Sequence, residues 1–159
     1  TFEERCEVNF DHPDAIDHEH LIEQVAQLAA GNEVTGPEYD FSHHTRFHKE
    51  HPVVSAPYII VEGIFALCYP GLRDMCQHRV FVEAPLATCL ERRIRRDMVE
   101  RGRTLEEVVH RFTSHVAPMY REHIEPTKLQ STLTVSGVDG LQLSLDRLLQ
   151  AINCNKTPT

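Results

Sequence analysis

The chain has 159 residues, 41% of them hydrophobic, and a formal net charge of -8. This size suits one compact domain, and no apolar run approaches the roughly 18 to 20 residues that a membrane span needs, so a soluble, cytoplasmic protein is expected. Residues 1–50 hold three Lys and Arg against twelve Asp and Glu, which argues against a protein that wraps nucleic acid.

The first third of the chain predicts one helix followed by a long irregular segment. Apolar residues recur at spacings of three and four before Gly31, which indicates an amphipathic helix that begins at Asp14 or Asp17 and that Gly31 closes. Residues 32–57 show no such period and are rich in Pro and Gly, so an irregular excursion with a short hairpin around residues 39–47 is expected. Excursions of this length are usually functional.

Strands then alternate with helices. A near-continuous apolar run at residues 58–63 is typical of a buried parallel strand whose carboxyl end faces a site. The other expected elements are a strand at residues 80–82, a helix at 86–98, a helix at 105–119, a weak strand at 133–135 and a terminal helix at 141–152. This order predicts an α/β fold with a mostly parallel sheet.

Arginines are concentrated in one segment. Residues 92–103 hold six of the thirteen arginines, and subtracting Asp97 and Glu100 leaves a charge of +4. The planar fork of arginine suits bidentate contact with phosphate or carboxylate. A helix, a break at Gly102 and a second helix would form a lid over a polyphosphate. The alternative, a solvated helix face whose cations offset the helix dipole, accounts for two arginines more readily than for six.

Two carboxylates are candidate functional groups. Glu62 ends the apolar run at residues 58–63, a place where phosphoryl-transfer enzymes hold Mg2+, although a solvated glutamate is equally compatible with the pattern. Asp11 precedes the first helix beside Phe10, and its two oxygens match a vicinal diol. Aspartates in such positions are also ordinary helix caps.

Aromatic and imidazole groups form a third candidate. The segment from Tyr39 to His44 offers side chains that stack on a ring and hydrogen-bond to it. The eleven histidines show no third ligand at zinc spacing, so metal ligation by histidine is the weaker interpretation.

Five segments, in this order and spacing, resemble the uridine kinase (uridine-cytidine kinase) family: NFDHPDAID, PEYDFSHHTR, YIIVEGIFAL, FVEAPLATCLERRIRRDMVERGR and VAPMYREHIEPTK. The resemblance implies a three-layer P-loop NTPase-like α/β fold with a parallel sheet and a helical lid. It also implies transfer of the γ-phosphoryl group of ATP or GTP, with Mg2+, to the 5′-hydroxyl of uridine or cytidine in pyrimidine salvage. The family further implies a homotetramer.

On the nucleoside side, the resemblance implies roles for residues of the first third of the chain. Asp11 matches the ribose-binding aspartate of the family, and Phe10 lies beside it. Tyr39 and His44 match the tyrosine and histidine that read the base, and Phe41 would form a wall of that pocket.

The resemblance also divides the arginines. Arg93 and Arg103 match arginines at the nucleoside, whereas Arg96 and Arg101 match arginines that reach the triphosphate and serve catalysis. Arg111 stands where the family usually carries a glutamine near the nucleoside. Glu62 matches the acidic group near Mg2+, to which it would bind through water.

The sequence departs from the family in two places. No GxxxxGK[ST] motif occurs, and the catalytic aspartate of the family is expected upstream of Thr1, so the N-terminal strand and the P-loop are expected to be missing. Residues 130–132 replace a Tyr-Ala-Asp of the family. We therefore expect residues 1–159 to form a single truncated nucleoside kinase domain, inactive alone, with a nucleoside-binding excursion at 32–57 and an Arg-rich lid at 92–111.

Three alternatives stay open. The first is a non-catalytic remnant that keeps the nucleoside pocket without phosphoryl transfer. The second is a phosphoribulokinase-like kinase that acts on another sugar hydroxyl, which Tyr39 and His44 make less favourable. The third is an RNA-binding protein that uses the arginine segment, against which the acidic first third argues.

Overall fold

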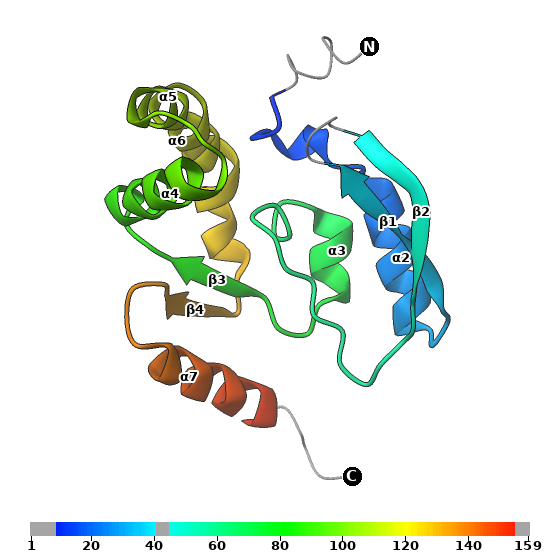
Figure 1. The fold of residues 1–159 in the computed structure, drawn as a ribbon. Helices are drawn as coiled ribbons and strands as arrows, with labels where there is room; N and C mark the ends of the chain where they lie inside the picture. The colour runs from blue at the N-terminus through cyan, green and yellow to red at the C-terminus, as the bar shows by residue number, and fades with distance from the viewer. Residues whose placement is uncertain (1–8, 41–44, 155–159) are drawn as a thin grey trace. The chain divides into compact units, whose positions relative to one another are not determined.

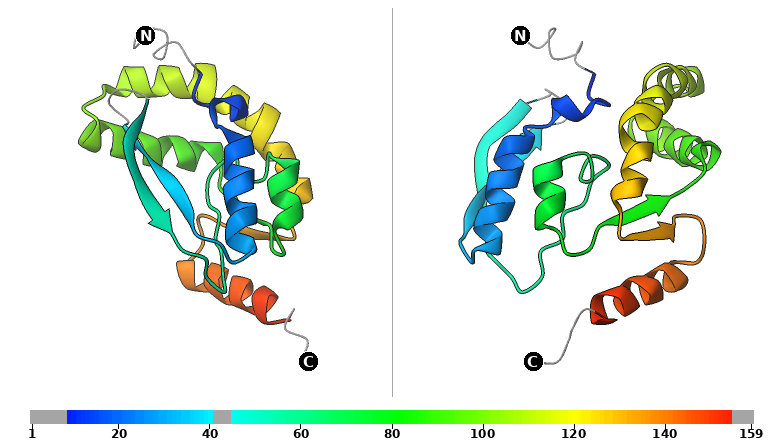
Figure 2. Two further views of the ribbon diagram at one scale, coloured as in Figure 1. Left: turned by 90° about the vertical axis from the view of Figure 1, so that its right-hand side faces the viewer. Right: turned by 180° about the vertical axis from the view of Figure 1, so that it is seen from behind.

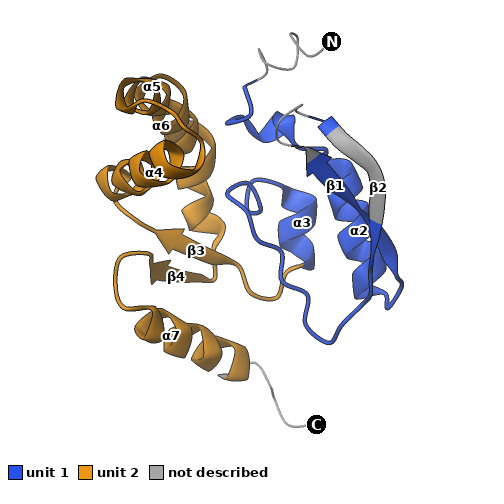
Figure 3. Ribbon diagram, viewed as in Figure 1, with its two compact units in different colours: residues 1–75 blue, residues 76–159 orange. Residues whose placement is uncertain are grey.

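The computed structural model describes residues 9–40 and 45–154 (Figure 1). The chain forms two compact units, residues 1–75 and residues 76–159 (Figure 3). In the described part of the chain, no helix has both the length and the apolar character required to cross a membrane.

Unit 1 contains two helices, a hairpin and a short helical turn. Its elements are η1 (Pro13–Ala15), α2 (His18–Ala29), β1 (Val34–Asp40), β2 (Thr45–Val53) and α3 (Pro70–Met75). Asp17 caps α2 by accepting a hydrogen bond from the amide of His20 at 3.3 Å. Gly31 follows the helix with a φ of 89°, which glycine adopts without strain. The predicted first helix is thus confirmed, with Asp17 as its start.

The strands β1 and β2 pair antiparallel, so much of the segment predicted as irregular is a hairpin. The expected hairpin was too short because polar, proline-containing strands lack an apolar alternation. Pro37 lies opposite Glu50 and Pro52 opposite Thr35. Proline is tolerated there because a two-stranded sheet has only edge strands, in which an amide can be absent without breaking a ladder.

The core of unit 1 lies between α2, α3 and the residues just before α3. Val25, Phe65, Tyr69 and Leu72 are buried, and the sequence did not predict the six-residue helix that carries Leu72. The hydroxyl of Tyr69 donates to the carbonyl of Pro13 at 2.8 Å, 56 residues away in the chain. This buried bond joins the start of the unit to its end.

The strand predicted at residues 58–63 is wrong. No strand is assigned there, and most of its apolar side chains are exposed, with Tyr58 62% exposed and Ile60 89% exposed. In the described residues, both sheets have two strands and neither includes this segment. A strand needs a hydrogen-bonded neighbour as well as apolar composition, and composition alone is what the prediction used.

Unit 2 is built on two parallel strands. Its elements are β3 (Val80–Glu83), α4 (Leu86–Glu100), α5 (Leu105–Arg111), a π-helical stretch (Phe112–Val116), α6 (Ala117–Met119), a second π-helical stretch (Tyr120–Ile124), a 3₁₀ helix (Glu125–Gln130), β4 (Leu133–Ser136) and α7 (Leu141–Cys154). The strands run in register from Val80 opposite Leu133 to Glu83 opposite Ser136. The strands predicted at residues 80–82 and 133–135 and the predicted α/β class are confirmed.

Helices cover both sides of the β3–β4 pair, which gives unit 2 three layers. Helices α4, α5 and α6 lie on one side and α7 on the other (Figures 1 and 2). The core contains Phe81 and Val135 from the strands, together with Val108, Phe112 and Ala117 from the helices.

The helix predicted at residues 105–119 continues as helical turns to residue 130, with two π-helical stretches. Pro118 lacks an amide to bond the carbonyl one turn earlier, and its ring crowds that carbonyl. Wider turns on either side relieve the crowding, as is common in helices that contain proline or an inserted polar group. In the turn before Pro118, the hydroxyls of Thr113 and Ser114 donate to the carbonyls of Val109 and His110, respectively.

Candidate functional site

The break between α4 and α5 is fixed by local contacts. Helix α4 ends at Glu100, and Gly102 has a φ of 62°, in the left-handed region. Thr104 caps the start of α5: its hydroxyl accepts from the amide of Glu107, and the Glu107 carboxylate accepts from the amide of Thr104 at 2.8 Å. This reciprocal cap satisfies two amides at the helix start. The sequence prediction of a helix, a glycine break and a second helix is confirmed.

Asp97, in the last turn of α4, is the centre of an arginine cluster formed by Arg93, Arg96, Arg101 and Arg103. Its side chain is 0% exposed. One oxygen, Oδ1, lies 2.8 Å from Arg96 and 3.6 Å from Arg101. The other, Oδ2, lies 3.0 Å from Arg103 and 3.5 Å from Arg93.

The main chain reinforces this arrangement. The amides of Arg101 and Arg103 both donate to the carbonyl of Asp97, each at 3.2 Å. Asp97 thus anchors the loop through its backbone and the guanidinium groups through its side chain.

The cluster carries a net positive charge, and the arginines favour the ionised form of the Asp97 carboxylate. Four guanidinium groups surround one carboxylate, which leaves a local charge of 4 − 1 = +3. Burial by itself would raise the pKa of Asp97, but the hydrogen bond and charge of Arg96 and the charges of Arg101 and Arg93 outweigh it and hold the pKa below its ordinary value. The side chains of Arg96 and Arg101 are 45% and 47% exposed, so they remain open to an anion from solvent.

Three other arginines of this region lie outside the cluster. Arg92 donates to the carbonyl of Gly137 at 2.9 Å and so ties α4 to the loop after β4. Arg95 is exposed on α4, and Arg111 is exposed as the last residue of α5.

The remaining predicted site residues belong to unit 1. Phe10 and Asp11 are half-buried just before η1, and the amide of Asp11 donates to Asn9 Oδ1 at 3.1 Å. Tyr39 is 37% exposed on β1. Phe41 and His44 lie outside the described residues.

Glu62 is exposed in the segment that does not form a strand. Among residues 9–40 and 45–154, no group of three or more His, Cys, Asp or Glu side chains is arranged to hold a metal ion. One exposed carboxylate is compatible with Mg2+ when phosphate oxygens and waters supply the other ligands, which is the usual arrangement of this ion in phosphoryl-transfer sites.

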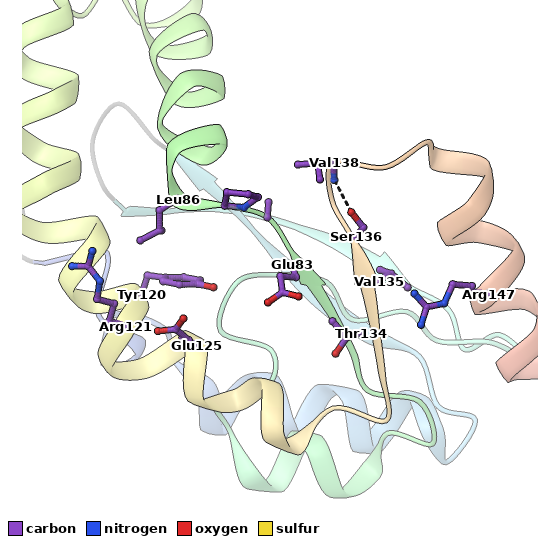
Figure 4. Close-up of a pocket in the computed structure, with 12 residues that line it drawn as sticks. Glu83, Leu86, Tyr120, Arg121, Glu125, Thr134, Val135, Ser136, Val138 and Arg147 are labelled. Atoms are coloured by element: carbon purple, nitrogen blue, oxygen red, sulfur yellow. Dashed lines mark hydrogen bonds between the residues drawn. The ribbon is translucent and has the colours of Figure 1, made fainter.

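A cavity of about 510 Å³ lies in unit 2 near the carboxyl ends of β3 and β4 (Figure 4). Glu83, Tyr120 and Glu125 extend into it from three segments, and Glu83 also pairs with Lys128 at 2.5 Å. Burial and then the nearby charge of Glu125 raise the pKa of Tyr120. Parallel sheets commonly bind ligands at this end of their strands. Glu83 at a strand end was the signal that could have indicated this cavity.

The sequence interpretation also missed the role of Asp97. Its signal is a position three residues after Ile94, on the apolar stripe of α4 that Leu90 and Ile94 define. An acidic residue on a buried stripe with arginines on both sides predicts a buried ion-pair centre.

A parallel strand pair between helical layers, with a cationic cluster at a helix break, defines an α/β protein equipped to bind an anion. The family model described as "Phosphoribulokinase / Uridine kinase family" matches residues 3–143. A uridine kinase of Vibrio campbellii is 39% identical over 158 residues, covering 95% of this chain and 74% of the relative. One of Aliivibrio fischeri is 40% identical with the same coverage. The chain belongs to the phosphoribulokinase/uridine kinase family, which confirms the resemblance seen in the sequence.

Proposed function

We propose that this chain is the nucleoside-binding and lid portion of a nucleoside kinase that phosphorylates uridine or cytidine at the 5′-hydroxyl. The observation that carries the proposal is the cluster of four arginines around Asp97, in a segment that lies within the family match. Four forks at a helix break, two of them about half exposed, suit a triphosphate. Relatives named uridine kinase support the nucleoside as the acceptor.

In the proposed reaction, the 5′-hydroxyl oxygen forms a bond to the γ-phosphorus of ATP or GTP. The bond from that phosphorus to the β–γ bridging oxygen breaks, which gives UMP or CMP and a nucleoside diphosphate, and the hydroxyl proton leaves to a base. Little covalent chemistry falls to the protein in such a transfer, so positioning and charge stabilisation carry the catalysis. Glu62 would hold Mg2+ through water, and the ion, when bound, would supply positive charge at the phosphates.

Each proposed site residue has one task. Arg96 and Arg101 neutralise charge on the triphosphate as it develops, and Arg93 and Arg103 contact the nucleoside. Asp11 accepts from the ribose hydroxyls and Phe10 lies beside the sugar. The base would be read by Tyr39 and by the residues outside the described ranges, Phe41 and His44, with Arg111 near the nucleoside.

The setting of this activity is also proposed. A nucleoside kinase of this kind would act in pyrimidine salvage in the cytoplasm, as a homo-oligomer and without a nucleic-acid partner. A second candidate is a module that binds nucleoside without transferring phosphate, a role that does not require a GxxxxGK[ST] motif.

Calorimetry with the 159-residue chain tests the proposal. We expect uridine and cytidine to bind and ribulose 5-phosphate not to bind. Asp11→Ala should weaken uridine binding by about tenfold or more, because two hydrogen bonds to the ribose are lost. Asp14→Ala removes an exposed carboxylate three residues away and is the matched control.

Two outcomes would contradict the assignment. Undetectable uridine binding would overturn the nucleoside site, and unchanged binding in Asp11→Ala would overturn the ribose role. The chain fused to the P-loop segment of a uridine kinase relative, incubated with uridine, ATP and Mg2+ and followed by chromatography for UMP, separates the two candidates: turnover supports the kinase, whereas binding without turnover supports the module.

A further inference from the structure

The two oxygens of Asp97 each hold a different pair of arginines. Oδ1 lies within 3.6 Å of Arg96 and Arg101, and Oδ2 within 3.5 Å of Arg103 and Arg93. In each pair one contact is short, 2.8 Å or 3.0 Å, and the other is long. The carboxylate is therefore shared equally between two pairs of guanidinium groups.

The two pairs of arginines on Asp97 are the same two pairs that are proposed to bind the two ligands. The pair on Oδ1 is the pair proposed for the triphosphate, and the pair on Oδ2 is the pair proposed for the nucleoside. The geometry of the carboxylate and the family resemblance are independent observations, and both divide the four arginines in the same way.

The Asp97 side chain is held in place and cannot move toward a bound ligand. Its side chain is 0% exposed, it lies within helix α4, and its carbonyl holds the amides of Arg101 and Arg103. An arginine carries five N–H donors, so one contact with Asp97 leaves other donors for a ligand. The carboxylate thus works as a fixed point around which the guanidinium groups are arranged.

We infer that Asp97 is the positioning residue of the arginine cluster and couples the binding of nucleoside to the binding of triphosphate. The inference rests on the proposed function, which gives one pair to each ligand. Ordering a flexible arginine lowers affinity, and groups held in advance by a shared partner lose less freedom on binding. When one ligand orders its pair around Asp97, the other pair is also more ordered, so the second ligand binds more tightly.

The affinity of Asp97→Asn for an anion distinguishes a positioning role of Asp97 from a purely electrostatic one. If Asp97 only reduced the charge of the cluster, Asp97→Asn would raise that charge from +3 to +4 and tighten the binding of any anion. If Asp97 positions the arginines, Asn would place an NH2 donor against one pair of donors, and anion binding would weaken.

The experiment uses calorimetry on the wild-type chain with tripolyphosphate alone, uridine alone, and uridine in saturating tripolyphosphate. We expect tripolyphosphate to tighten uridine binding by about fivefold. Asp97→Asn should bind tripolyphosphate about tenfold more weakly, a size typical of losing a partner that orients ligand-contacting groups. In that variant the effect of tripolyphosphate on uridine affinity should be lost.

Two further variants complete the design. Asp97→Glu keeps the charge and should restore part of the tripolyphosphate affinity and of the coupling. Glu91→Gln makes the same charge change as Asp97→Asn at an exposed site of α4 and should leave both unchanged. If circular dichroism shows that Asp97→Asn does not fold, Asp97→Glu decides the question, because an altered coupling in a folded variant is still predicted.

Unchanged or tighter tripolyphosphate binding in folded Asp97→Asn would overturn the positioning role. An unchanged coupling factor would overturn the link between the two ligands. Failure of the proposed function is a separate result: the wild-type chain would bind tripolyphosphate but not uridine, and the effect of Asp97→Asn on tripolyphosphate would still test positioning.

Discussion

The segment from Arg93 to Glu107 and the segment at residues 58–63 are held in very different ways. In the first, the ion pairs of Asp97 with the four arginines and the hydrogen bonds that cap α5 join residues of that same segment. In the second, Ile60 is 89% exposed and no described strand pairs with the segment. Short-range contacts are sufficient to build a helix break with a charged centre, whereas a strand depends on a neighbour that is distant in the chain.

The largest difference is expected between the free energies of unfolding of two variants that each lose one carboxylate, one from each segment. Asp97→Asn should lower the free energy of unfolding by about 2 kcal/mol, because buried hydrogen bonds to a charged group are lost. Glu62→Gln, in the exposed segment, should stay within about 0.5 kcal/mol of wild type. Urea unfolding followed by circular dichroism measures both, and equal losses would mean that the two segments are held alike.

Acidification should gradually reduce the contribution of the Asp97 carboxylate to the free energy of unfolding. The pKa of Asp97 is lowered from 3.8 in the folded chain, so its stabilising effect is complete above that value and is lost as pH falls through the folded pKa. The free energy of unfolding of wild type should therefore fall more steeply than that of Asp97→Asn as the pH falls below about 4. Parallel slopes in urea unfolding across this range would contradict the lowered pKa.

A smaller effect is expected at the start of α5. Thr104→Ala removes the hydroxyl that accepts from the Glu107 amide and should lower stability by about 1 kcal/mol, a typical loss for a helix cap. Thr104→Ser retains the hydroxyl and should unfold within a few degrees of wild type. Thermal unfolding measures the pair, and equal losses in both variants would show that packing of the methyl group matters more than the cap.

The sequence was most informative where structure is local. The spacing of apolar residues predicted helix α4 and the start of α5, and Gly102 marked the break between them. The same pattern of apolar residues predicted β3 correctly and residues 58–63 wrongly, because it cannot show whether a pairing strand exists. Helix α3 was too short to give a period.

The candidate site was predictable in its residue types but not in its centre. The density of arginine indicates an anion site, and the family resemblance assigns one pair of arginines to the nucleoside and another pair to the triphosphate. Asp97 entered the sequence interpretation only as a subtracted charge, because a buried acid is recognised by what surrounds it in space. The cavity beside Glu83 and Tyr120 joins segments separated by more than thirty residues, a proximity that follows from the pairing of β3 with β4.

The two main-chain hydrogen bonds to the Asp97 carbonyl fix the path of the loop independently of the side chains that the loop carries. The amides of Arg101 and Arg103 exist whatever residues occupy those positions, proline excepted, so the loop can keep its course while its chemistry changes. Positions 101 and 103 are thus natural targets for randomised libraries, in which new acceptor or donor preferences can be selected on an unaltered scaffold. Substitution at position 97 would keep the carbonyl that holds the loop but would remove the carboxylate around which the guanidinium groups are arranged.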